Sequence, residues 1–177
     1  KSFPQWDVYY LYEYAASLML HGDGEPLLIC YEDAGARMCY VVMKRDISDD
    51  TRFQGSLGEN EYFDFETPYG YGGPLVDGDF LAESQKKFAE QLHAFCTANG
   101  VVAQFIRFHP LLGNQTLFAE VSESTYIRDT VYIDTSPEDK IFTNLDSKNR
   151  NMVRKAQKAG IWVSIRPSYD YKPFLDM

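Results

Sequence analysis

A short stretch rich in glycine, proline and tyrosine is the first place where this chain could hold a ligand. It reads Thr67-Pro68-Tyr69-Gly70-Tyr71-Gly72-Gly73-Pro74. Proline fixes φ and lacks an N–H donor, while glycine permits positive φ and close approach of another group, so we expect a loop here. Tyr69 and Tyr71 each offer a flat apolar ring with a hydroxyl at its tip, which suits ligand binding. The alternative is a rigid turn whose tyrosines pack on the core.

Two further polar residues, Arg107 and His109, follow a strongly apolar segment. Residues 101–108 read Val-Val-Ala-Gln-Phe-Ile-Arg-Phe, which predicts a strand buried on both faces. Ligands gather at strand ends in open α/β sheets, so both residues are candidate binding residues. The alternative for Arg107 is an ion pair with a carboxylate at the edge of the core, and for His109 it is stacking against Pro110. Asp64 and Glu66, just before the glycine-rich loop, could act as acid or base, although acids before a turn are ordinary.

A basic helix is predicted over residues 147–159. It carries Lys148, Arg150, Arg154, Lys155 and Lys158 in a chain with a net charge of −9. Arg150 and Arg154 lie one turn apart. Guanidinium groups suit phosphate oxygens and lysines add point charge, so the helix is a candidate docking site for phosphate or pyrophosphate. A solvated helix face is the alternative.

Several classes of site are excluded or disfavoured. The acidic balance, with a pI of about 4.8, argues against general coating of nucleic acid. The 3 cysteines form no CxxC pair and the 3 histidines no HExxH motif, which indicates reduced thiols in a cytosolic protein and no metal site. No apolar run approaches the roughly 20 residues of a membrane span. No Ser-His-Asp order, P-loop or dinucleotide motif is present.

The elements that would position these residues alternate between helices and strands. Helices are predicted over residues 8–19, 82–98 and 147–159, with a further helix start at Ser136. Asp7 is the expected N-cap of the first helix, whose apolar stripe is Val8, Leu11, Tyr12, Ala15, Leu18 and Met19. The expected buried face of the second helix is Phe88, Leu92, Phe95 and Cys96. Strands are predicted over residues 27–31, 38–43, 62–66, 101–108, 117–121, 126–133 and 161–165. Because hairpins also occur, we expect an α/β fold with a mixed, mostly antiparallel twisted sheet flanked by helices. The chain lacks an initial Met and ends on an apolar stretch, so we expect a fragment of a longer protein.

Taken together, the motifs resemble the FemA/FemB-like (Fem) family of peptidoglycan bridge aminoacyl transferases, within the Gcn5-related N-acetyltransferase (GNAT) superfamily. The glycine-rich loop and the Arg-Lys-Ala helix are the most specific matches. The matching stretches are Asp7-Val8-Tyr9-Tyr10 with Glu13-Tyr14, the loop 67–74, residues 105–112 with Asn114, and residues 149–151 with 154–160.

The resemblance implies that residues 1–177 form one GNAT-like domain, the N-terminal half of a two-domain cytoplasmic transferase. Such an enzyme would move an aminoacyl or acyl group to an amine of a cell-wall precursor or surface glycan. Aminoacyl-tRNA or acyl-CoA would be the donor for the complete protein, through the second half. No pyrophosphate motif of an ordinary acetyltransferase is present, so this half is expected to bind no cofactor.

The candidate substrate-binding residues are Tyr69, Tyr71, Arg107, His109, Asn114, Arg150, Arg154 and Lys155. No catalytic base can be assigned from the sequence, and Tyr71 and His109 are candidates only. The alternative function is a non-catalytic module that recognises an anionic glycan-phosphate, or a scaffold for the partner half.

Overall fold

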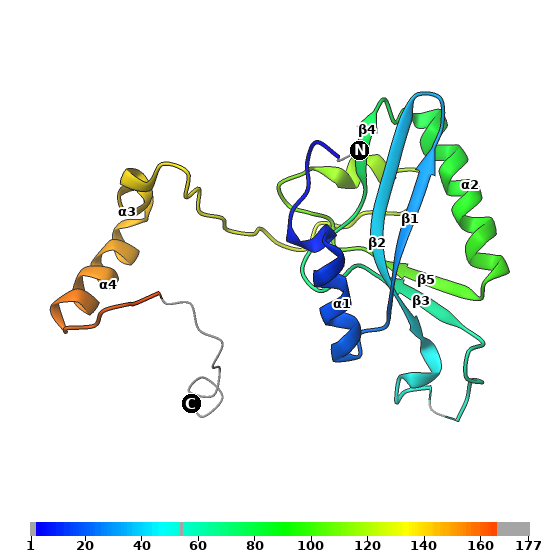
Figure 1. Ribbon diagram of the computed structural model, residues 1–177, viewed down its shortest axis with the longest axis horizontal. Helices are drawn as coiled ribbons and strands as arrows, with labels where there is room; N and C mark the ends of the chain where they lie inside the picture. Colours follow the sequence, from blue (N-terminus) through cyan, green and yellow to red (C-terminus); the bar gives the residue numbers. More distant parts are fainter. Residues whose placement is uncertain (1–2, 54, 166–177) are drawn as a thin grey trace. The chain divides into compact units, whose positions relative to one another are not determined.

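The structure is a computed structural model that describes residues 3–53 and 55–165. The chain divides into two compact units, residues 1–128 and 129–177. The first unit contains a five-stranded sheet with helices, and the second contains short helices (Figure 1). The expected α/β class with a mixed sheet flanked by helices is confirmed. A single GNAT-like domain over the whole chain stays a prediction.

The first and the last elements of the first unit are short 3₁₀ helices. Its elements in order are η1 (Val8–Tyr10), α1 (Tyr12–His21), β1 (Glu25–Glu32), β2 (Ala36–Asp46), η2 (Ile47–Asp49), β3 (Phe63–Glu66), β4 (Leu75–Gly78), α2 (Ala82–Ala98), β5 (Val101–Phe105) and η3 (Asn114–Phe118). The helix over 82–98 and the strands that start near 27, 38 and 62 are thus confirmed. β4 was not predicted, because Leu75–Gly78 is short and follows proline and glycine.

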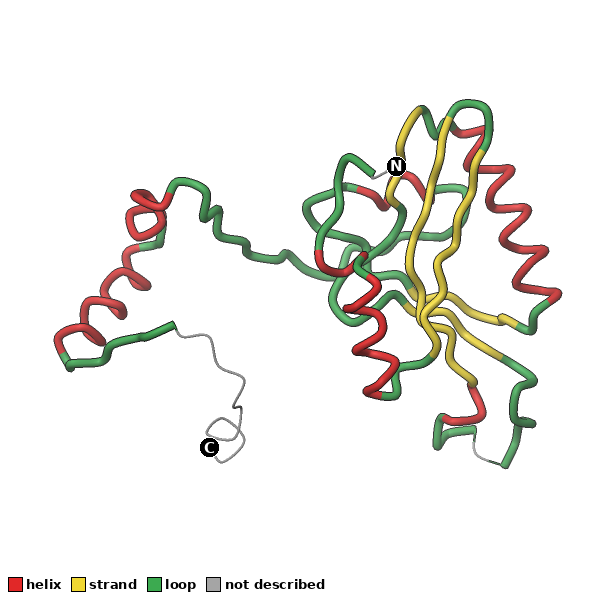
Figure 2. The backbone as a smooth tube through the Cα atoms, in the orientation of Figure 1, coloured by secondary structure: helices red, strands yellow, loops and turns green. Residues whose placement is uncertain are grey.

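The sheet has the order β1-β2-β3-β5, and β4 also pairs with β2 (Figure 2). β1, β3 and β4 run antiparallel to β2, whereas β3 and β5 are parallel. β3 uses the Met43–Asp46 end of β2 and β4 uses the Ala36–Cys39 end. β3 and β4 therefore pair with the same edge of β2, and the loop 67–74 connects them.

An aromatic core lies between the sheet and α2. Tyr40 and Phe118 are fully buried, with ring centroids 5.1 Å apart, and Phe88 of α2 stacks on Phe118 at 5.6 Å. Leu92, one turn after Phe88, completes the helix face that packs on the sheet. Burial of each large apolar side chain contributes about 1.5–3 kcal/mol. Phe95, predicted on the same face, is instead 47% exposed.

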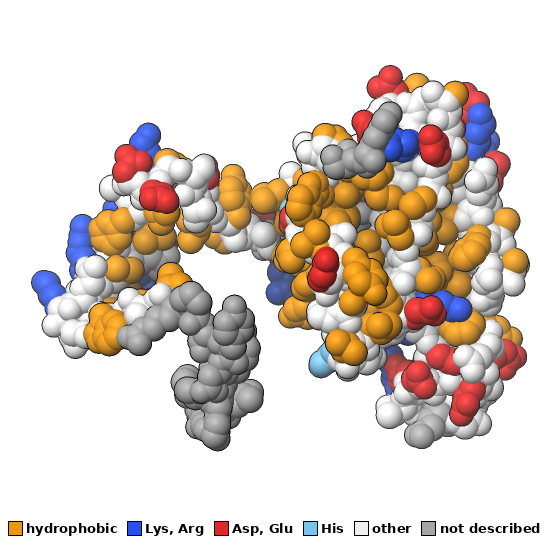
Figure 3. Space-filling view, in the orientation of Figure 1, with side chains coloured by type: hydrophobic (Ala, Val, Ile, Leu, Met, Phe, Trp, Pro, Cys, Tyr) orange, Lys and Arg blue, Asp and Glu red, His pale blue; other side chains and the backbone are white. Residues whose placement is uncertain are grey.

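The first helix differs from its prediction at both its start and its packing. Asp7 caps η1 rather than α1, because its Oδ1 accepts from the Tyr9 N–H at 2.9 Å. Of the apolar stripe, only Ala15 is buried, and Tyr12 is 74% exposed. Apolar side chains consequently gather on the surface near α1 (Figure 3).

The second unit contains η4 (Glu138–Lys140), α3 (Ile141–Asn144) and α4 (Ser147–Lys158). Asp146 caps α4, since its Oδ1 accepts from the Asn149 N–H at 2.8 Å. The basic helix is confirmed. The helix start predicted at Ser136 falls two residues later, at Glu138, where Pro137 is the N-cap residue and no side chain caps the turn. None of the described residues 129–165 is buried. This unit therefore lacks a core of its own within the described residues.

Three strand predictions are wrong, and a fourth strand is shorter and less buried than predicted. Residues 117–121 lie in and after the 3₁₀ helix η3, and residues 126–133 and 161–165 form no strand. Apolar sequence predicts burial, but a strand also needs a neighbouring strand for its backbone hydrogen bonds. The strand 101–108 ends at Phe105, and only Val101 is buried along it. The prediction of burial on both faces fails because β5 is the last strand in the sheet order.

Candidate functional site

The loop 67–74 and the chain after β5 are joined by backbone hydrogen bonds. Gly72 N–H donates to Arg107 O at 2.8 Å, and His109 N–H donates to Gly72 O at 3.0 Å. At the start of the loop, Arg107 N–H donates to Thr67 Oγ1 at 3.1 Å. These bonds continue the parallel pairing of β3 and β5 beyond the strands. The structure thus brings together the two stretches of this unit that the sequence singled out.

Asn114 fixes the second end of the loop. It is 2% exposed, and its Nδ2 donates to Gly72 O at 2.9 Å and to Pro74 O at 3.2 Å. Its Oδ1 accepts from the His109 N–H at 3.1 Å. Nδ2 also lies 3.4 Å from the hydroxyl of Tyr10, whose pKa is raised by burial. A buried amide that bonds to three segments supports the path of the loop, so the observed role of Asn114 is structural.

His109 is also engaged by the protein. It is 6% exposed, and the Leu111 N–H donates to its Nδ1 at 3.2 Å. This contact assigns the ring proton to Nε2, which donates to Asp7 Oδ2 at 2.7 Å. Both ring nitrogens therefore have partners, and His109 is poorly placed to take a proton from a substrate.

Two tyrosines, Tyr9 and Tyr71, pack against this histidine, and a third, Tyr14, packs against Tyr9. The ring of Tyr9 lies 5.7 Å from Tyr71 and 5.6 Å from Tyr14, and Tyr71 lies 5.9 Å from His109, all edge to face. Such pairs contribute about 0.5–1.5 kcal/mol each beyond burial. Burial raises the pKa of Tyr9, and the nearby charge of Asp7 adds to the shift. Tyr71 thus lies in an aromatic cluster that holds the N-terminal segment against the loop.

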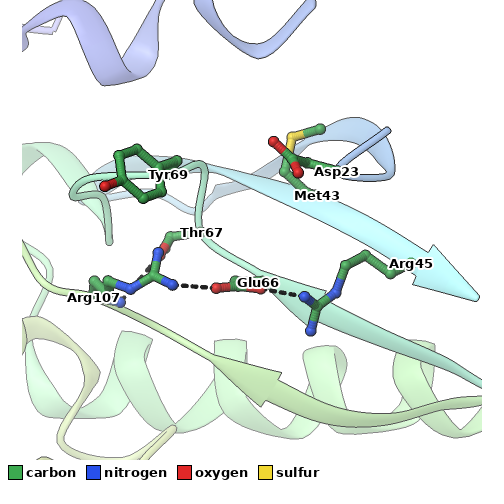
Figure 4. A pocket seen from close by; sticks show the side chains of 7 residues that line it. All are labelled: Asp23, Met43, Arg45, Glu66, Thr67, Tyr69 and Arg107. Carbon is green, nitrogen blue, oxygen red and sulfur yellow. Dashed lines mark hydrogen bonds and ion pairs between the residues drawn. The ribbon is translucent and has the colours of Figure 1, made fainter. Parts of the chain in front are cut away.

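Tyr69 and Arg107 lie in a different place, a pocket of about 90 Å³ at the first end of the loop (Figure 4). The pocket is lined by Asp23, Met43, Arg45, Glu66, Thr67, Tyr69 and Arg107. At roughly 30 Å³ per water molecule, this volume suits one functional group of a larger ligand. Tyr69 is 75% exposed, so its ring is a wall that a ligand can contact from solvent.

A chain of ion pairs forms the floor of this pocket. Glu66 accepts from Arg107 on one oxygen and pairs with Arg45 Nη1 at 2.5 Å on the other. Arg45 also donates from Nε and Nη2 to Asp64, at 2.8 and 2.6 Å. These bonds raise the pKa of the Arg45 guanidinium. Asp64 and Glu66 are therefore ion-pair partners, and the ion pair with an edge carboxylate, the alternative for Arg107, is present.

Arg107 nevertheless retains unused hydrogen-bonding capacity. Its Nη1 is buried and has no hydrogen-bond partner. A buried unpaired donor costs roughly 1–3 kcal/mol, so an anionic oxygen placed here would recover that free energy. The side chain is 36% exposed, which leaves the guanidinium room to turn toward a ligand. Figure 4 shows it between Thr67 and Glu66, facing the same pocket as Tyr69.

The three candidates on α4 belong to the second unit. Arg150 Nη1 donates to Thr143 O at 2.8 Å and to Leu145 O, so it joins α4 to α3. The guanidinium of Arg154 lies 5.3 Å from the ring centroid of Phe142, a cation–π contact. Lys155 is exposed. Substrate binding by these three residues stays a prediction.

Some site residues could not be identified from the sequence. Asp7 was interpreted only as a helix cap, although its second oxygen holds His109. Asp23 and Arg45 were not singled out, since neither lies in a motif and only the fold brings them to Tyr69. The register of β2 against β3, which places Arg45 opposite Asp64, is the signal that identifies Arg45.

Comparisons of the chain with protein-family models, with curated proteins and with solved structures gave no match. Within residues 3–53 and 55–165, no group of three or more His, Cys, Asp or Glu side chains is placed to hold a metal ion. No helix in the described part of the chain combines the length and apolarity needed to cross a membrane.

Proposed function

We propose that this chain is the acceptor-binding, N-terminal half of a FemA/FemB-like aminoacyl or acyl transferase with a GNAT fold. Its acceptor would be an amine of a peptidoglycan precursor or surface glycan. The motifs that resemble the family support this proposal, as does the mixed sheet flanked by helices.

The observation that carries the proposal is that Tyr69 and Arg107 line one pocket. They lie 38 positions apart in the numbering (107 minus 69), yet the loop and the end of β5 bring them together. A tyrosine face beside an arginine with an unpaired donor suits an anionic group on an otherwise apolar or sugar-like ligand. Phosphate and carboxylate groups of a cell-wall precursor have this chemistry.

The described residues support recognition rather than proton transfer. Both nitrogens of His109 are engaged, so one of the two candidate bases is removed. Aminoacyl transfer from an activated ester depends mainly on orienting donor and amine, which a binding half can supply. The donor, aminoacyl-tRNA or acyl-CoA, would enter with the second half of a cytoplasmic enzyme. A non-catalytic module for an anionic glycan-phosphate is the second candidate, favoured by the same engaged histidine.

Calorimetric titration of the chain with a UDP-linked muropeptide tests the proposal. We expect saturable binding, and we expect Arg107→Gln to weaken it about tenfold, because a charged hydrogen bond contributes roughly 1.5–3 kcal/mol. Arg52→Gln is the matched control, since Arg52 is 79% exposed, pairs with Asp50 and does not line the pocket. Equal weakening by both variants would show that general charge, not the pocket, binds the ligand.

Turnover separates the two candidate functions. In the complete protein, transfer of an aminoacyl or acyl group to the muropeptide would support the transferase. Binding of the muropeptide with no transfer from either donor would support the binding module.

A further inference from the structure

Two of the three cysteines lie directly opposite each other in the sheet. Cys30 of β1 and Cys39 of β2 are register partners in the antiparallel hairpin. Directly opposed residues project their side chains from the same face, with Cβ atoms about 4.5–5.5 Å apart. Both thiols are free in the structure. The long hairpin that carries them is visible in Figures 1 and 2.

The hairpin turn decides what kind of pair the cysteines form. Asp33 N–H donates to Ala36 O at 3.0 Å, which makes these residues the hydrogen-bonded pair next to the turn. Hydrogen-bonded and non-hydrogen-bonded pairs alternate along an antiparallel ladder. Three pairs further from the turn, Cys30 and Cys39 form a non-hydrogen-bonded pair. Their Cα separation of about 4.5 Å falls within the range that a disulfide spans, about 4.4–6.8 Å.

The two thiols differ in their access to solvent. Cys30 is exposed, whereas Cys39 is buried. Burial, followed by the negative charge of Cys30, raises the pKa of the Cys39 thiol to about 12. An oxidant from solvent therefore meets Cys30 first, and Cys39 stays protonated until a bond to sulfur is available beside it.

We propose that Cys30 and Cys39 form a reversible cross-strand disulfide when the chain meets a low-molecular-weight disulfide. The Cys30 thiolate attacks one sulfur of the small disulfide, whose S–S bond breaks and releases one thiolate. Cys39 then gives its proton to that thiolate and attacks the Cys30 sulfur, which releases the second thiolate. The two protein thiols are oxidised and one small disulfide is reduced to two thiols. The proposal does not depend on the proposed function.

The bond would form next to the second end of the loop 67–74. Cys39 is also the register partner of Leu75, the residue that directly follows the loop 67–74. Cys39 lies close enough to Tyr10 for its charge to contribute to the raised pKa of that phenol. Oxidation would thus fix β1 to the segment of β2 on which the second end of the loop is held.

Thiol counting on the wild-type chain in glutathione redox buffers tests the proposal. After denaturation and alkylation, mass spectrometry should find all 3 cysteines modified in the reduced protein. In the oxidised monomer it should find one, with no glutathione adduct. Peptide mapping should then identify a Cys30–Cys39 linkage without any substitution in the chain. A wild-type chain that keeps three free thiols, or a glutathione adduct on Cys30, would overturn the proposal.

Three variants sharpen this test. Cys96→Ser, the control, should form the disulfide at the same glutathione ratio as the wild type. Cys39→Ser should trap glutathione on Cys30, because the resolving thiol is absent. Cys30→Ser should form no intramolecular disulfide. An intramolecular disulfide in Cys30→Ser would overturn the assignment, because it would join Cys39 to Cys96.

Discussion

The two ends of the loop 67–74 have the same kinds of residues but different surroundings. At the second end, Gly72, Gly73 and Pro74 are buried. The carbonyl oxygens of Gly72 and Pro74 accept from Asn114, and Gly72 also bonds to the chain after β5. At the first end, Tyr69 is 75% exposed and forms a wall of the pocket with Arg107.

This difference shows how one loop can combine rigidity and recognition. Backbone groups that bond to a buried amide have one geometry, so the second end fixes the path of the chain. The exposed tyrosine at the first end is then presented from a fixed base, which lowers the entropy cost of binding a ligand. Substitutions at the second end, or of the buried Thr67 and Pro68 at the first, should therefore affect stability, whereas substitution of the exposed Tyr69 should affect binding.

Asn114→Ala should have the largest effect. It removes the side-chain partner of Pro74 O at a buried position. It also removes the second partner of Gly72 O and of the His109 N–H, which still bond to each other. Because a buried unsatisfied polar group costs roughly 1–3 kcal/mol, we expect the free energy of unfolding to fall by about 3 kcal/mol. Urea unfolding followed by circular dichroism measures it. Gln115→Ala, the exposed neighbour, is the control and should change stability by less than about 0.5 kcal/mol.

Gly73→Ala should come next. The backbone of Gly73 has φ +90°, and a Cβ there would lie 2.8 Å from Phe108 Cδ1 and 3.0 Å from Asn114 Nδ2. We expect a loss of about 2 kcal/mol, from backbone strain together with this overlap. Gly113→Ala separates the two causes, since Gly113 has φ +62° with no atom near its Cβ position. If both variants lose the same stability, the close packing of the loop contributes nothing.

Asp7→Asn should have a smaller effect. It weakens the bond between Asp7 Oδ2 and His109 Nε2, and it leaves the capping oxygen for the Tyr9 N–H. The loss of one hydrogen bond should lower the free energy of unfolding by about 1 kcal/mol. Asp79→Asn, at an exposed carboxylate, serves as control. An unchanged unfolding midpoint for Asp7→Asn would mean that the N-terminal segment is not held through His109.

Tyr69→Ala should change stability least, by no more than about 0.5 kcal/mol, because the ring is mostly exposed. The same variant should weaken binding of the muropeptide, measured by calorimetry. Tyr71→Ala is its matched partner: it removes the ring contacts with Tyr9 and His109 and should cost about 1–3 kcal/mol of stability. The reverse result, with Tyr69 the more destabilising substitution, would remove the distinction between the two ends.

Local sequence rules predicted the elements whose stability is local or strongly patterned. The helix 82–98 has Phe88 and Leu92 on one face, and the hairpin has alternating apolar strands around a polar turn. The same rules failed for residues 126–133 and 161–165, whose apolar side chains find no neighbouring strand among the described residues. They also predicted too long and too buried a strand at β5, because burial of a strand depends on its place in the sheet order.

The sequence by itself determined that this is an α/β chain with a rigid loop of glycine, proline and tyrosine and a basic helix, because backbone restrictions and side-chain periodicity are local properties. The tertiary structure alone decided which of the two tyrosines faces a pocket. It also turned His109 and Asn114 from candidate ligand contacts into supports of the loop, and it placed Arg107 in an ion-pair chain with one donor unused. These outcomes depend on sheet register and on contacts between residues as far apart as Asp7 and His109, which no local rule contains.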